Sequence, residues 1–165
     1  AFKKKGENIE TVAIALAAAK ASTVAKSLIS LDHTDFFIIS ADQILECEGR
    51  WFDKPSDKGA AQETLLVLRG KTHHLVSAVT VFHEEKCIWR YIETPVLRMR
   101  NFSDKFLASY LESSTPEILE SVGAYRLESS GVQLFSHIDG NYFTILGLPL
   151  LALLGFLREM KVLAE

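Results

Sequence analysis

Two long strand-like runs lie near the middle of the chain, separated by a short polar segment. The first run is Leu75 to Phe82, the second is Cys87 to Met99, and His83-Glu84-Glu85-Lys86 lies between them. β-Branched and aromatic residues favour extended backbone, and a short polar break between two such runs is typical of a hairpin. The chain is therefore predicted to be built around a β-sheet.

Helical segments surround these strands. Ile9 to Leu28 is rich in Ala and Lys and contains no Gly or Pro, which predicts a long helix. Further helices are expected at 57–69, 104–111, after Pro116 and at 149–161, and further strands at 36–40, 125–128, 132–138 and 142–146. The predicted fold is α/β, a single domain over residues 1–165 with a mixed, twisted β-sheet flanked by helices.

Composition limits the classes of function. The 165 residues are 48% hydrophobic, which is enough for one core, and 18 Lys and Arg against 21 Asp and Glu provide no basic field for nucleic acid. Two cysteines make no disulfide framework or zinc pattern, so a cytoplasmic location is predicted. The apolar stretch from Ile145 to Leu157 is interrupted by Gly and Pro and is shorter than the roughly 20 residues of a membrane span. No membrane association is predicted.

A carboxylate and an ammonium are candidates for chemistry. Phe36 to Ser40 predicts a buried strand that delivers Asp42 at its carboxyl end, where α/β sheets usually hold ligands. Lys54 follows after a turn at Gly49. A carboxylate can hold a divalent cation while a nearby ammonium binds phosphate oxygens. On spacing alone a structural interpretation is favoured, in which Asp42 ends a strand in a turn and Lys54 is a solvated charge before Pro55.

Five short segments, in order, resemble those of the Maf-like family. They are Ser40-Ala41-Asp42-Gln43-Ile44-Leu45, Lys54-Pro55, Thr72 to Val79, Val122-Gly123-Ala124-Tyr125 and Gly147-Leu148-Pro149-Leu150. Each is common, but the ordered set is specific, and the resemblance runs from Ile9 to the end. It implies a Maf/ITPase-like fold with a nucleotide cleft. It also implies a hydrolase that splits a nucleoside triphosphate between its α and β phosphates, removes unwanted or modified nucleotides, uses a divalent metal, Mg²⁺, and forms a homodimer.

The resemblance also implies roles for individual residues. Asp42 resembles the family's essential aspartate, which coordinates the metal or activates water. Lys54 resembles a lysine that contacts phosphate, and Lys20 resembles a second basic contact, although a solvated lysine on an Ala-rich helix fits it equally well. Glu128 corresponds to a position in a strand at the cleft, where it ligates metal or contacts the nucleotide; an exposed strand glutamate is an equal alternative.

The histidines are interpreted as structural. Thr72 and His73 resemble a conserved Thr-His pair, for which side-chain bonds to nearby backbone are favoured over catalysis. His33, His83 and His137 have no companion ligands at metal spacing.

One segment of the family pattern has no counterpart. The family begins with a strand and a Ser-x-Ser-Pro-Arg-Arg-like loop that binds the triphosphate, and nothing in Ala1 to Asn8 matches it. Either these arginines lie in a segment outside this sequence, or the protein lacks them and phosphate binding loses its main cationic contribution, since lysines do not reproduce the planar guanidinium fork. The alternative function is a nucleotide-binding regulator of cell division and septum formation that has lost turnover.

Substrate choice is predicted from three positions. Gln43, Ser121 and Glu128 resemble the branch associated with 7-methyl-GTP more than the branch associated with dTTP and UTP. A methylated guanine carries positive charge, which an aromatic face or a carboxylate would favour. Trp51, Tyr125 and Glu128 are the candidates for that contact.

Overall fold

The computed structural model describes residues 8–114 and 116–164, so the residues preceding Asn8, where the arginine loop was sought, lie outside it. Its elements, in chain order, are α1 (Ile9–Ser30), β1 (Phe37–Cys47), β2 (Arg50–Phe52), α2 (Lys58–Leu68), β3 (Thr72–His83), β4 (Lys86–Glu93), β5 (Val96–Met99), α3 (Asp104–Ser114), the 3-10 helices η1 (Glu117–Glu120) and η2 (Ser130–Leu134), β6 (Phe135–Asp139), α4 (Tyr142–Ile145) and α5 (Leu150–Glu159). They divide between two compact units. Unit 1 comprises residues 1–43, 76–93 and 141–165, and unit 2 comprises residues 44–75 and 94–140.

The strands form one six-stranded sheet with the order β2-β1-β3-β5-β6, in which β4 also pairs with β3. The α/β class is confirmed. The pairings of β1 with β2, β3 with β4, β3 with β5 and β5 with β6 are all antiparallel, whereas a mixed sheet was expected. For the pairs β1–β2 and β3–β4 the physical reason is the tight turn that joins the strands, because a parallel pair needs a longer crossover.

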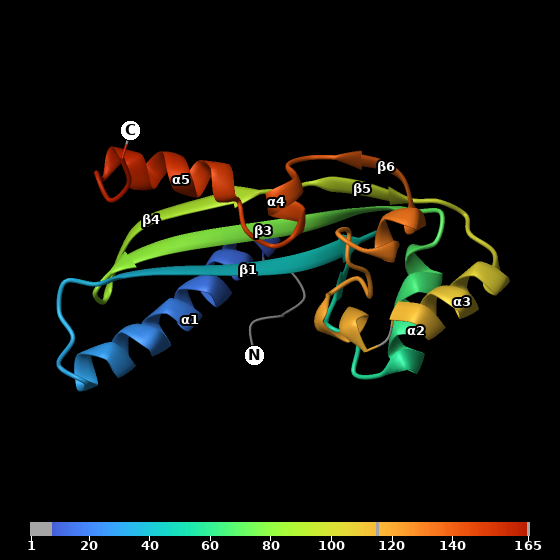
Figure 1. The fold of residues 1–165 in the computed structure, drawn as a ribbon, viewed down its shortest axis with the longest axis horizontal. Helices are drawn as coiled ribbons and strands as arrows, with labels where there is room; N and C mark the ends of the chain where they lie inside the picture. Colours follow the sequence, from blue (N-terminus) through green and yellow to red (C-terminus); the bar gives the residue numbers. More distant parts are fainter. Residues whose placement is uncertain (1–7, 115, 165) are drawn as a thin grey trace. The chain divides into compact units, whose positions relative to one another are not determined.

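Unit 1 places helices on both faces of its strands (Figure 1). Phe82 and Ile38 pack against Ala21 and Ala25 of α1. On β3, Val79 and Val81 pack instead against Leu153 and Leu157 of α5. Since side chains alternate between the two faces of a strand, the apolar run in β3 supplies both layers.

Helix α1 begins at a defined cap and buries a narrow stripe. The side chain of Asn8 accepts hydrogen bonds from the backbone N–H groups of Glu10 (2.9 Å) and Thr11 (3.3 Å). Its fully buried alanines recur every fourth residue, at positions 13, 17, 21 and 25. By length and hydropathy α1 would also suffice to cross a membrane. A helix packed in a core passes the same test, and the alanine stripe of α1 is packed in this way.

Unit 2 is built on the hairpin of β1 and β2 and on the pairing of β3, β5 and β6. Leu45 pairs with Phe52 across the hairpin, and Glu48 (φ 52°) and Gly49 (φ 80°) form its turn. His73 and Leu97 lie opposite each other, as do Leu97 and Ile138. The core comprises buried apolar side chains from these strands and from α2, α3 and η1, among them Leu45, Leu65, Leu68, Leu75, Leu97, Leu107, Leu111 and Ile118.

Four strand predictions differ from the structure. The strand expected at 132–138 begins only at Phe135, because Ser130–Leu134 form the 3-10 helix η2. The run 87–99 is divided into β4 and β5 at Thr94-Pro95, since proline has no N–H to donate to a ladder. Residues 142–146 begin as the helix α4, because the side chain of Asn141 accepts a hydrogen bond from the N–H of Phe143 (2.9 Å). Residues 125–128 form no strand: Ala124 has a positive φ (56°), and the N–H of Ser129 turns back to the carbonyl of Arg126 (3.2 Å).

Candidate functional site

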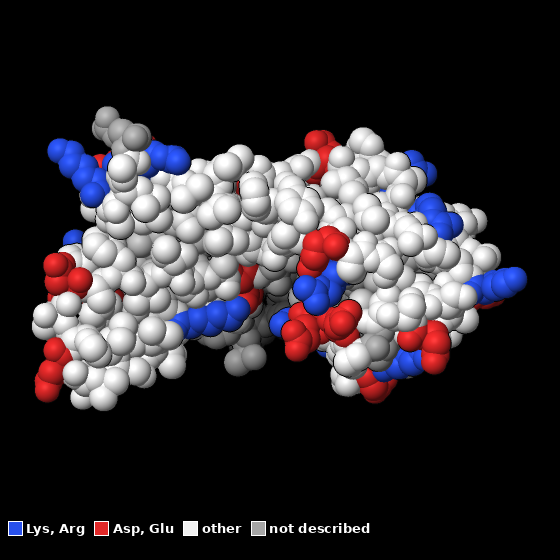
Figure 2. All heavy atoms as spheres, viewed as in Figure 1, with Lys and Arg blue, Asp and Glu red and all other residues white. Residues whose placement is uncertain are grey.

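Charge alone does not locate a site on this molecule. On the face drawn in Figure 2, Lys and Arg side chains lie among Asp and Glu side chains of the described residues. The site therefore has to be built from individual contacts within each unit.

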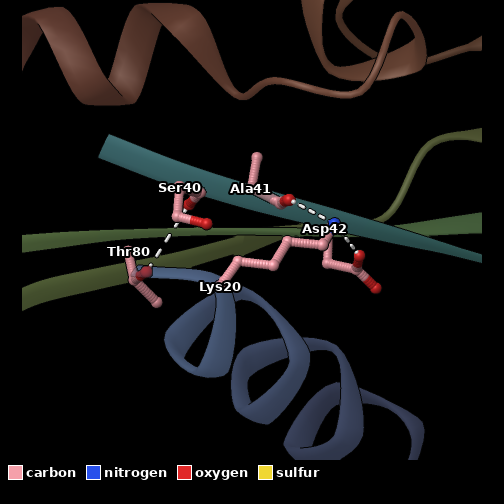
Figure 3. A network of polar contacts seen from close by, with 5 residues as sticks. All are labelled: Lys20, Ser40, Ala41, Asp42 and Thr80. Carbon is pink, nitrogen blue, oxygen red and sulfur yellow. Dashed lines mark hydrogen bonds and ion pairs between the residues drawn. The ribbon is translucent and has the colours of Figure 1, made fainter. Parts of the chain in front are cut away.

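The carboxylate of Asp42 is held by Lys20 in unit 1. Lys20 extends from α1 to β1, and its ammonium forms an ion pair with Oδ1 of Asp42 and donates to the carbonyl of Ala41 (3.1 Å) (Figure 3). The side chain of Asp42 is 16% exposed and that of Lys20 is 58% exposed. An ammonium has three N–H donors, and the residues that the structure describes accept from two of them, so one donor of Lys20 is left for a further acceptor.

Asp42 lies inside β1 and not at its carboxyl end, which corrects the prediction. The strand continues to Cys47, because its last residues, Leu45 to Cys47, pair with β2. Its register is supported locally, since the hydroxyl of the buried Thr80 on β3 donates to the carbonyl of Ser40 (3.5 Å) (Figure 3). A side chain in mid-strand has a more restricted position than one in a turn.

A polar network next to Asp42 was not predicted. The amide nitrogen of Gln43 donates to Oγ of Ser77 (2.7 Å) and to the carbonyls of Thr144 (3.0 Å) and Ile145 (3.3 Å). The hydroxyl of Ser77 donates to the carbonyl of Thr144 (3.2 Å), and the hydroxyl of Thr144 donates to Glu93. Ser77 and Thr144 are fully buried. The available sequence signal was the pair of polar residues, Ser77 and Thr80, within the apolar run of β3.

Lys54 belongs to unit 2, in the segment between β2 and α2. It is exposed and makes no ion pair with any residue that the structure describes. The following Pro55 is buried. Proline fixes its own φ and restricts the residue before it, so the backbone of Lys54 is anchored while its side chain stays in solvent.

Glu128 also belongs to unit 2, and it lies in a turn, which corrects its assignment to a strand. Its Oε1 accepts a hydrogen bond from Nε of Arg126 (2.8 Å). Burial opposes ionisation of this carboxyl, but hydrogen bonds from its own backbone N–H and from Arg126 outweigh burial and lower the pKa of Glu128. The carboxylate is therefore kept charged by an arginine two residues away.

His73 and Tyr125 form a buried pair in unit 2. Nε2 of His73 lies 2.9 Å from Oη of Tyr125, and the side chain of His73 is fully buried. Burial, with a smaller contribution from His74, lowers the pKa of His73 to about 4, and burial raises the pKa of Tyr125. The predicted bond from His73 to nearby backbone is wrong, because the partner of this buried imidazole is the side chain of Tyr125, 52 residues along the chain. Tyr125 is 6% exposed, which removes it as a candidate to stack on a base.

No cluster of three or more metal-ligating side chains occurs among residues 8–114 and 116–164. Asp42 and Glu128 fall in different units, so the structure brings Asp42 together with Lys20, and it brings Glu128 together with Arg126. Mg²⁺ is commonly bound through one or two carboxylates, with waters and substrate phosphates completing its octahedron. The oxygen donors of Asp42 and Glu128 are of the kind that fits such a metal.

Comparison with known proteins identifies the family of this chain. A model of the Maf-like protein family matches residues 2–160. The chain belongs to the Maf-like family. The matched range includes Lys20, Asp42, Lys54 and Glu128.

Several relatives cover almost the whole Maf-like chain. A nucleoside triphosphate pyrophosphatase of Granulibacter bethesdensis is 44% identical over 162 residues, 98% of this chain and 80% of the relative. One of the same name from Paramagnetospirillum magneticum is 50% identical over 131 residues, 79% of this chain and 68% of the relative. A 7-methyl-GTP pyrophosphatase of Rhizobium meliloti is 41% identical over 159 residues, 96% of this chain and 77% of the relative. These names describe hydrolases, in agreement with the predicted enzyme class.

Proposed function

We propose that this Maf-like protein hydrolyses a nucleoside triphosphate to a nucleoside monophosphate and pyrophosphate. The observation that carries the proposal is the carboxylate of Asp42, which is mostly buried in mid-strand and paired with a lysine that retains a free N–H donor. Buried carboxylates are costly unless paired, so such a position is typical of a functional site. The names of the relatives supply the reaction.

In the proposed reaction a water oxygen bonds to the α phosphorus. The bond between this phosphorus and the oxygen that bridges to the β phosphorus breaks, and pyrophosphate leaves with the electron pair. Asp42 either accepts the proton of the water or ligates the metal. Lys20 and Lys54 donate to phosphate oxygens, where developing charge is stabilised most.

A divalent cation, Mg²⁺, fits the oxygen donors of Asp42 and Glu128, and when bound it would neutralise phosphate charge. The chain's own contribution is to orient these carboxylates. Arg126 does this for Glu128, and Lys20 does it for Asp42.

Within this activity we propose that 7-methyl-GTP is preferred over dTTP and UTP. The name of the relative from Rhizobium meliloti supports this choice. With Tyr125 buried, Trp51 and Glu128 remain as groups for a positively charged base. Glu128 is the stronger of the two, because its carboxylate is charged and one third exposed.

We further propose a cytoplasmic location and a homodimer. The thiols of Cys47 and Cys87 are both free, which suits a reducing compartment. Cell fractionation and light scattering on the purified protein test these two assignments: recovery outside the cytoplasm, or a monomeric mass, would contradict them.

The experiment is pyrophosphate release from GTP, 7-methyl-GTP, dTTP and UTP, with and without Mg²⁺. Asp42→Asn keeps the shape of the side chain and removes its charge, and we expect kcat to fall by about a thousandfold. Asp32→Asn is the matched control, because Asp32 is exposed in a turn with φ 59°, a conformation that Asn also adopts. Undiminished turnover in Asp42→Asn would overturn the role of Asp42. Nucleotide binding without turnover by the unaltered protein would instead favour the septum-formation regulator.

A further inference from the structure

Unit 2 contains a hollow that the proposed reaction does not use. It has a volume of about 660 Å³ and lies on β3, β5 and β6 and the ends of these strands. Sites for small molecules usually measure roughly 300–1,000 Å³, so a ligand larger than a single phosphate would fit. The polar groups that line it are Thr72, Arg98, Arg100, Asn101, Ser136 and His137.

The register of the strands brings three of these side chains into one row. Thr72 pairs with Arg98, and Arg98 pairs with His137. Directly opposed residues on neighbouring strands project from the same face of a sheet. Their neighbours His73 and Leu97 are fully buried on the opposite face, and Thr72, Arg98 and His137 are exposed. The row is therefore a fixed property of the sheet.

The charge of the lining is positive. No Asp or Glu is among the lining residues, and Arg98 makes no ion pair with a described residue. Because Arg98 and Arg100 both line the hollow and no carboxylate does, an anion would be favoured there. The hydroxyl of Thr72 adds a donor at the same surface, whereas the hydroxyl of Ser136 donates to the carbonyl of Arg98 (3.3 Å).

Arg100 is held in a defined orientation. Its Nε donates to the carbonyl of Gln133 (2.5 Å), and its guanidinium carbon lies 4.2 Å from the ring centroid of Phe106. These contacts leave the terminal nitrogens of the fork available. A fixed guanidinium loses little conformational entropy when it binds an anion, and its planar fork matches two oxygens of a phosphate.

We propose that this hollow binds a phosphate-bearing small molecule through Arg98 and Arg100. The site is separate from Lys54 in the topology, because Lys54 follows β2, which pairs with β1, whereas the hollow lies on the other side of β1 in the strand order. The proposal does not depend on turnover. Phosphate is favoured over carboxylate because hydroxyl, amide and guanidinium donors converge on one hollow, which suits a group with several acceptor oxygens.

The test is calorimetric titration of the full chain with inorganic pyrophosphate, and with citrate as a carboxylate of comparable charge. Arg98→Gln removes the cation and keeps an exposed polar side chain, and we expect roughly tenfold weaker pyrophosphate binding, as for loss of one charge-assisted contact. Arg90→Gln is the control, since Arg90 is exposed on β4 and makes no ion pair with a described residue. It should bind like the unaltered protein.

Titrations in a Lys54→Gln background distinguish this hollow from the candidate nucleotide site. Pyrophosphate binding that survives Lys54→Gln and weakens with Arg98→Gln supports the proposal. Binding that disappears with Lys54→Gln and is unchanged by Arg98→Gln overturns it, and so does citrate binding that depends on Arg98 without pyrophosphate binding. A protein that releases no pyrophosphate from any nucleotide would contradict the proposed function and leave this titration unaffected.

Discussion

The candidate site residues of the two units lie in different kinds of structural element. In unit 1, Asp42 and its neighbour Gln43 lie on a strand among buried groups, and each is bound by partners from other elements. In unit 2, Lys54 and Glu128 lie in connecting segments; Lys54 is exposed, and Glu128 is paired with the nearby Arg126. The proposed catalytic carboxylate thus lies on a strand, which fixes its position. The proposed ligand-binding groups lie on loops, which let their side chains move.

The physical reason is that a strand and a loop restrict their side chains to different degrees. A strand residue with neighbours on both sides has few accessible rotamers, whereas a residue between a strand and a helix can follow a bound phosphate. The buried polar groups of the two units also differ. Gln43 has three acceptors, but Nδ1 of His73 has no hydrogen-bond partner among the described residues. Three changes test this contrast.

Acid should weaken unit 2 before unit 1. His73 has a native pKa of about 4 against an ordinary value of 6.5, so between these values the unfolded chain binds more protons. Stability therefore falls as pH drops through this window, by up to about 3 kcal/mol. Hydrogen exchange at pH 7 and pH 4.5 should show earlier loss of protection in β5, β6 and residues 72–75 of β3 than in α1 and α5.

His73→Gln should remove most of this dependence of stability on pH, even where the substitution lowers the unfolding free energy at neutral pH. The control is His137→Gln, because His137 is exposed on β6. A pH dependence that stays intact in His73→Gln would contradict the assignment to this buried imidazole.

Removing the amide of Gln43 should destabilise the fold by about 2 kcal/mol, since three hydrogen bonds are lost and Ser77 loses a buried partner. Gln43→Ala is compared with Gln133→Ala, in which the exposed side chain is shortened and the backbone carbonyl is kept. Urea unfolding measures both. Equal effects would mean that the network in unit 1 is no better connected than the surface of unit 2.

Lys54→Gln should have the smallest effect and should act on activity alone. We expect kcat/KM to fall by about tenfold, as for one charge-assisted phosphate contact, with unchanged unfolding free energy because Lys54 makes no ion pair with a described residue. Lys105→Gln on α3 is the control. If Lys54→Gln lowers the unfolding free energy, or leaves kcat/KM unchanged, Lys54 is not an exposed phosphate-binding side chain. The contrast drawn between the two units would then be wrong.

Elements with strong local signals were predictable from the sequence. The absence of Gly and Pro from Ile9 to Leu28 predicted α1, and the polar break at 83–86 predicted the hairpin of β3 and β4. The predictions were wrong where a single residue decided the conformation. Pro95 divides the second run, and the cap at Asn141 converts an apolar strand pattern into a helix. Short apolar runs fit both periods, so flanking residues decide between them.

The sequence by itself determined the type of chemistry and the family. The ordered segments predicted the family, and they predicted Asp42 and Lys54 as a candidate carboxylate and ammonium, because residue identity and side-chain charge are local properties of the chain. The tertiary structure alone decided the partners. Lys20 meets Asp42, Gln43 meets Thr144 and His73 meets Tyr125 across separations of 22, 101 and 52 residues, and no local pattern encodes such contacts. Only the packing of α1 on the sheet makes Asp42 a paired and mostly buried carboxylate.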